Sequence, residues 1–137
     1  MTRDVRALIA HELARGDEAY RAAEVLLRES LLRDALSRAY YAALHFARAL
    51  LLTRGEEPLT HDGVVQRFSL HFVRGGVVTV TEGKVLGRLQ RIREEADYVA
   101  EREYDHEHVS QELESVRNFR AAVLRVFEQE DASPPRQ

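Results

Sequence analysis

Residues 31–54, LLRDALSRAYYAALHFARALLLTR, give the clearest signal of the fold class. Apolar side chains recur here at steps of four and three residues, which is the period of a helix that packs along one side. The members of this packing face are Leu36, Tyr40, Ala43, Ala47 and Leu50. The stretch therefore predicts one long α-helix, which Gly55 ends.

The same periodicity predicts helices on both sides of this stretch. They cover residues 3–29, 60–74 and 82–103, and a last helix follows residue 108. Gly16-Asp17 is a weak point in the first of them, and Thr60 is an N-cap for the short one. Residues 77–81, VVTVT, have strand character but no second strand to pair with, so they are read as an extended linker in which Thr81 can cap the next helix.

These elements define the fold class as all-α, an antiparallel four-helix bundle with an additional short helix. Residues 1–130 are expected to form a single domain, and the polar, proline-bearing residues 131–137 a disordered tail. A chain of 137 residues with 45% apolar and 31% charged side chains is long enough to bury one core.

Composition narrows the cellular context. There is no cysteine, which excludes disulfides and thiolate metal sites. No apolar run approaches the roughly 20 residues that span a bilayer, and the N-terminus lacks the features of a signal peptide. We expect a cytoplasmic protein with no membrane partner. The net charge of −3 argues against a surface coated with phosphate-binding groups but allows a local basic patch.

A polar stripe lies opposite the packing face of residues 31–54. It consists of Arg38, Tyr41, His45 and Arg48. Arginine can clamp a phosphate, tyrosine can stack on a base, and histidine can move a proton near neutral pH. Such a stripe is more often a solvated surface or a contact between helices, so the pattern alone leaves these alternatives open.

The histidines raise the question of a metal site. His106 and His108 are two residues apart in an expected loop, and His61 or His71 could add a third ligand only if the fold brings it there. The chain has no HExxH spacing and no glycine-rich phosphate loop after a strand. We therefore expect no metal and no cofactor.

Four segments together resemble those of a family of small prokaryotic HEPN-domain proteins. The segments are SRAYYAALH at 37–45, THDGV at 60–64, FVRG at 72–75 and REEADY at 93–98, the last like an R-x-x-A-D-Y signature. The resemblance extends from about Ala19 to Phe127. It implies a bundle of four or five helices, commonly a homodimer. Many HEPN proteins are toxin components or metal-independent ribonucleases, and many are encoded beside a minimal nucleotidyltransferase.

The resemblance also implies a catalytic pair, an arginine followed after four to six residues by a histidine. The positions after Arg93 are Tyr98, Val99 and Ala100, so the pair is not found there. Four other pairs have the spacing, and only Arg38/His45 also lies within a family-like segment and on one helix face. All four are Arg6/His11, Arg38/His45, Arg54/His61 and Arg102/His108.

Three functional hypotheses follow. In the first, the protein is a toxin-type or nucleic-acid-processing HEPN protein, with Arg38, His45 and Arg93 as catalytic candidates. The binding candidates in that hypothesis are Tyr41, Arg48, Asp97 and Tyr98. In the second, the chain is a non-catalytic module that binds a nucleotide or a nucleotidyltransferase partner. In the third, it is a structural or oligomerisation bundle.

Overall fold

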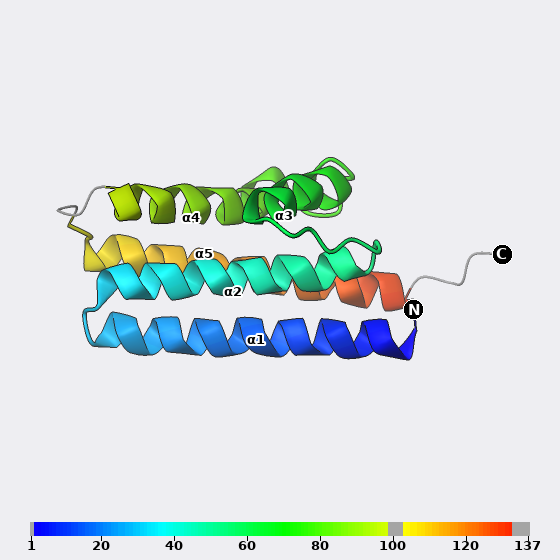
Figure 1. Ribbon diagram of the computed structural model, residues 1–137, viewed down its shortest axis with the longest axis horizontal. Coiled ribbons are helices and arrows are strands. Elements are labelled where there is room, and N and C mark those ends of the chain that lie inside the picture. Colours follow the sequence, from blue (N-terminus) through cyan, green and yellow to red (C-terminus); the bar gives the residue numbers. More distant parts are fainter. Residues whose placement is uncertain (1, 99–102, 133–137) are drawn as a thin grey trace.

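Five α-helices run side by side in the computed structural model, which describes residues 2–98 and 103–132 and, within them, no side chains at 96–98 or 131–132 (Figure 1). In chain order the elements are α1 (Arg3–Arg28), α2 (Leu32–Leu52), α3 (His61–Phe68), a π-helical turn (Ser69–Val73), α4 (Val80–Tyr98) and α5 (His106–Ala132). No strand occurs among the described residues. The all-α bundle predicted from the sequence is confirmed.

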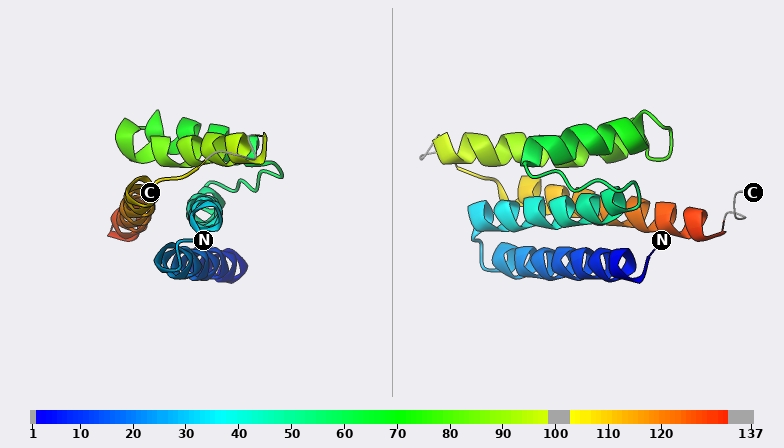
Figure 2. Two further views of the ribbon diagram at one scale, coloured as in Figure 1. Left: turned by 90° about the vertical axis from the view of Figure 1, so that its left-hand side faces the viewer. Right: turned by 45° about the vertical axis from the view of Figure 1, so that its right-hand side comes forward.

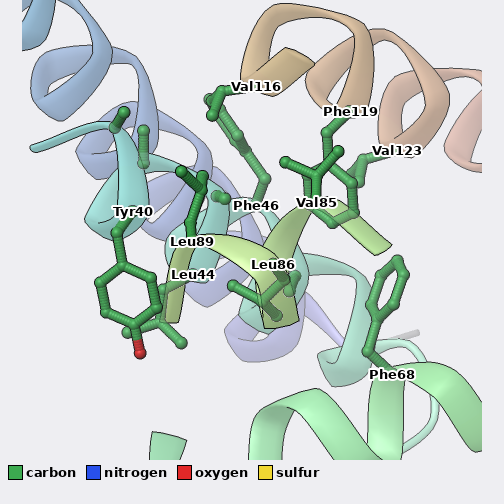
Figure 3. Close-up of a cluster of buried hydrophobic side chains, with 14 of the residues drawn as sticks. Tyr40, Leu44, Phe46, Phe68, Val85, Leu86, Leu89, Val116, Phe119 and Val123 are labelled. Carbon is green, nitrogen blue, oxygen red and sulfur yellow. The ribbon is translucent and has the colours of Figure 1, made fainter. Parts of the chain in front are cut away.

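The central helix is α2, which contacts α1, α3, α4 and α5. Figure 2 shows the layers this produces: α1 on one side, α2 beside α5 in the middle, and α3 with α4 on the other side. All five residues of the predicted packing face of α2 are buried. Around them Phe46, Phe68, Leu86 and Phe119 close a single core (Figure 3).

Helix α1 passes through Gly16-Asp17 without a break, so the predicted weak point is wrong. Gly16 is buried against α2, and a Cβ added there would lie 2.4 Å from Cε1 of Phe46. Glycine at this position lets the two backbones approach closely. Its place in the helix is explained by packing rather than by a turn.

The ends of α2 and α3 follow the sequence. Gly55 has a φ of 71°, and the Glu56 N–H donates to the Leu51 carbonyl, which is the closing bond of a Schellman turn. The Thr60 hydroxyl accepts from the Gly63 N–H at 3.0 Å and so caps α3 as predicted.

Helix α4 begins earlier than predicted. Thr79 is its cap: the Thr79 hydroxyl accepts from the Glu82 N–H at 3.1 Å, and the Glu82 carboxylate accepts from the Thr79 N–H at 3.0 Å. This reciprocal capping box replaces the predicted cap at Thr81 and shortens the extended linker.

Helix α5 also starts before the predicted position. Asp105 accepts from the Glu107 N–H at 2.8 Å, so His106 and His108 lie in the first helical turn rather than in a loop. At its other end α5 runs to Ala132, two residues beyond the expected domain boundary, and residues 133–137 lie outside the described part. No helix within the described ranges is both long and apolar enough to cross a bilayer.

Candidate functional site

The predicted polar stripe lines a groove between α1 and α2. Arg38, Tyr41, His45 and Arg48 all line this groove, which has a volume of about 660 Å³. The volume lies within the range of pockets that hold small ligands. Helix α1 contributes Glu12, Arg15 and Glu18 to the lining, and the first residue of α3, His61, also lines the groove. The four residues that the helical spacing placed on one face of α2 therefore do lie together on the surface of this groove.

Arg93 of α4 lines a neighbouring pocket and lies over the ring of Tyr41, which lines this groove. Its guanidinium carbon lies 5.0 Å from the ring centroid of Tyr41 and 5.5 Å from that of Tyr40. Both distances are within the range of cation–π attraction. Tyr41 lines the groove, and the guanidinium of Arg93 lies over its ring. Arg48 of α2 and Arg93 of α4 therefore both lie near the Tyr40–Tyr41 pair.

His61 completes this cluster. The sequence had placed it in the family-like segment THDGV, as a third metal ligand and as a spacing partner of Arg54, but not among the site residues. Its ring lies 5.5 Å from that of Tyr40 and 6.1 Å from that of Tyr41, between centroids. Burial lowers the pKa of His61, and the nearby charges of Arg48 and Arg93 lower it further, against a smaller opposing effect of Asp62. At neutral pH the ring is therefore uncharged and able to accept a proton.

His45 has a different environment. Its Nδ1 lies 2.6 Å from Oε2 of Glu12 on α1. Because a carboxylate only accepts hydrogen bonds, Nδ1 carries the proton and Nε2 is the other ring position. The bond joins residues 33 positions apart and fixes the ring within the groove.

Tyr40 belongs to the packed side of the cluster. Burial raises the pKa of its hydroxyl to about 12, so the phenol stays neutral. Its oxygen has no hydrogen-bond partner among the described residues. Tyr40 therefore supports Arg93 and His61 through its ring.

Of the four arginine–histidine pairs with the family's spacing, one occupies the groove. Arg38 and His45 both line it. Arg54 instead pairs with Glu130 at 2.7 Å and lies over Phe72, away from the tyrosine pair that holds His61. Arg6 and His11 lie exposed on α1.

The remaining pair includes Arg102, which lies outside the described residues, as do the side chains of the predicted binding residues Asp97 and Tyr98. Among the side chains that are described, no three histidine, aspartate or glutamate residues come together as a candidate metal site.

Comparison with known proteins identifies the class. The model of the HEPN domain family matches residues 10–126, so the chain belongs to this family. A protein of Methanocaldococcus jannaschii named as a candidate toxin is 36% identical over 107 residues, which cover 78% of this chain and 80% of that protein. A UPF0332 protein of Thermotoga maritima is 32% identical over 106 residues, covering 77% and 80% of the two chains. A UPF0332 protein of Pyrococcus horikoshii is 44% identical over 70 residues, covering 51% and 49%.

Proposed function

We propose that this chain is a toxin-type HEPN protein that cleaves RNA without a metal ion. The observation that carries the proposal is the meeting of Arg48, His61 and Arg93, from three different helices, around the Tyr40–Tyr41 pair. Two guanidiniums can hold a phosphate and offset the charge that develops on it during cleavage. A neutral imidazole beside them can accept the proton of a ribose hydroxyl.

The rest of the groove supports the same chemistry. Arg38, which forms no ion pair with a described carboxylate, is available for a neighbouring phosphate, and Tyr41 presents an aromatic ring on which a base can stack. Both residues were candidates from the sequence. The toxin-type assignment is supported by relatives from Methanocaldococcus jannaschii that are named as candidate toxins.

The test is cleavage of purified total RNA in the presence of a chelator. The wild-type protein is expected to cleave it, and Arg93→Ala and Arg48→Ala to slow cleavage by about 100-fold or more, the loss typical of removing one group that stabilises transition-state charge. Arg91→Ala is the matched control, since Arg91 lies exposed on the same helix. Equal rates for all four proteins, or no cleavage by the wild type, would refute the proposal.

A second candidate function is binding without catalysis. It is favoured by the residues Tyr98, Val99 and Ala100, which stand where the family's histidine is expected after Arg93. In that case the groove binds a nucleotide or a partner protein. Calorimetric titration with adenosine and guanosine nucleotides distinguishes the two: saturable binding without any RNA cleavage supports the second.

We propose that the protein binds two partners. One is a second copy of the chain, and the other is a minimal nucleotidyltransferase, as the family resemblance implies. Light scattering on the purified protein tests the homodimer, and a monomeric mass contradicts it. Co-expression with a nucleotidyltransferase encoded beside the gene tests the other partner, which should co-purify and suppress toxicity in growing cells.

A further inference from the structure

Two histidines from different helices face the same groove. His45 lies on α2 one turn after Tyr41, and His61 begins α3 with its ring 6.1 Å from that of Tyr41. Residues four apart on a helix are neighbours on its surface. Both imidazoles therefore lie near Tyr41, and both line the groove.

The two rings differ in their direct partners, because of the two only His45 has a described carboxylate at hydrogen-bond distance. His61 lies near Arg48 from α2 and Arg93 from α4, with Asp62 as its acidic neighbour. Asp62 itself accepts a hydrogen bond from Gln90 of α4 at 2.6 Å. Positive neighbours keep an imidazole in its neutral form, which is the form that accepts a proton.

His45 has a carboxylate at hydrogen-bond distance, the Glu12 contact of 2.6 Å. Glu18 and Arg15 of α1 and Arg38 and Arg48 of α2 also line its groove. Glu12 orients the ring and offsets the charge that the ring gains when Nε2 binds a proton. An imidazole held in this way is suited to donate that proton.

We propose that His61 and His45 each carry out one of the two proton transfers of RNA cleavage, an inference that rests on the proposed function. His61 accepts the proton of the ribose 2′-hydroxyl, and His45 gives a proton to the leaving 5′ oxygen. Glu12 is a positioning residue that acts through His45. His61 thereby supplies the imidazole that the sequence lacks after Arg93.

The reaction balances with these groups alone. The 2′ oxygen forms a bond to phosphorus as its proton passes to His61, and the bond from phosphorus to the 5′ oxygen breaks as that oxygen receives the proton of His45. The products are a 2′,3′-cyclic phosphate and a 5′-hydroxyl. One proton is taken up and one is released, so no metal or other reactant is required.

The first test is the pH dependence of kcat/KM on total RNA. The wild type should give a bell-shaped profile, since one histidine must be neutral and the other protonated. His61→Ala should lose the acidic limb and His45→Ala the basic limb, each with a rate lowered about 100-fold or more. His11→Ala, an exposed histidine of α1, should keep both limbs. Variants that keep the wild-type profile overturn the inference.

The second test separates the two roles by the leaving group. The RNA is an oligonucleotide with sulfur in place of the 5′ bridging oxygen at a linkage that the wild type cleaves. A thiolate leaves without protonation, so this substrate should restore the rate of His45→Ala and leave His61→Ala slow. If the sulfur substrate restores the cleavage rate of both variants, or of neither, the assignment of His45 as the proton donor is wrong.

Glu12 is tested by a pair of variants. Glu12→Gln retains an oxygen that can accept from Nδ1 of His45, whereas Glu12→Ala removes it. Misorientation of the His45 ring can lower the cleavage rate by up to about 100-fold. Glu12→Ala should therefore cleave RNA more slowly than Glu12→Gln, and the sulfur substrate should restore the activity of Glu12→Ala. Equal loss in the two variants contradicts a positioning role.

The two proposals fail in different ways. If the wild type cleaves no RNA, the proposed function fails and this inference fails with it. If the wild type cleaves RNA and Arg93→Ala does not, while both histidine variants keep bell-shaped profiles, only the division between the histidines is wrong.

Discussion

At the scale of the residue, His61 shows how position changes the chemistry of a side chain. Thr60 caps α3 and so places the imidazole at the first helical position, where it meets the tyrosine pair of α2. Burial and two guanidiniums then lower its pKa from the ordinary value of 6.5. A neutral histidine close to two arginines is the feature on which the proposed chemistry depends.

We expect NMR titration to give His61 a pKa below 6.5, and Arg48→Ala or Arg93→Ala to raise it, since each removes a nearby positive charge. Arg91→Ala should leave the titration unchanged.

The lowered pKa of His61 also makes the stability of the fold depend on pH. The unfolded state binds more protons than the folded state below pH 6.5, so the free energy of unfolding falls as the pH decreases below 6.5. Urea unfolding at several pH values should show a shallower decrease in His61→Gln.

At the scale of the element, close contact between helices determines where glycine is needed. Gly16 of α1 lies against Phe46 of α2, and Gly87 of α4 has its nearest neighbour, Val65, at 3.7 Å from a Cβ built there. We expect Gly16→Ala to lower the free energy of unfolding by about 1–3 kcal/mol through overpacking. Gly87→Ala is the matched control and should raise it by up to about 1 kcal/mol, since alanine is the better helix former. Chemical denaturation measures both.

The start of α4 gives a second prediction at this scale. Thr79→Ala removes the hydroxyl of the capping box and should cost about 1 kcal/mol of stability. Thr81→Ala, two residues later on an exposed position within the helix, should cost less. A larger loss for Thr81→Ala would return the cap to the position predicted from the sequence.

At the scale of the whole molecule, a net charge of −3 coexists with a local concentration of arginine. Arg38, Arg48 and Arg93 lie in or beside one groove. Each neutralised phosphate of a single strand contributes a slope of about −0.7 to log K against log salt concentration, so three contacts predict a slope of about −2. Single alanine variants should reduce its magnitude by about 0.7, and Arg91→Ala should not. Fluorescence anisotropy with a single-stranded RNA at several salt concentrations measures these slopes.

Much of the bundle could be predicted because it depends on local periodicity. The packing face and the polar stripe of α2 lie on opposite sides of one helix, and a turn of 100° per residue places them from the sequence alone. Gly55 and Thr60 act on their own neighbours in the chain, so their roles were also readable. The cap of α4 was missed because Thr79 and Thr81 are both plausible caps, and the choice depends on Glu82.

Periodicity along the chain was enough to predict the all-helical fold, the packing face of α2 and the polar stripe of α2 that lines the groove. Two contacts could be seen only in the folded bundle: Glu12 with His45, 33 residues apart, and Arg93 and His61 with the same two tyrosines. The two kinds of feature differ in the range over which they act along the chain. Helix formation and capping act over a few neighbouring residues, whereas contacts between helices depend on how whole packing faces fit together, and no single segment encodes that fit.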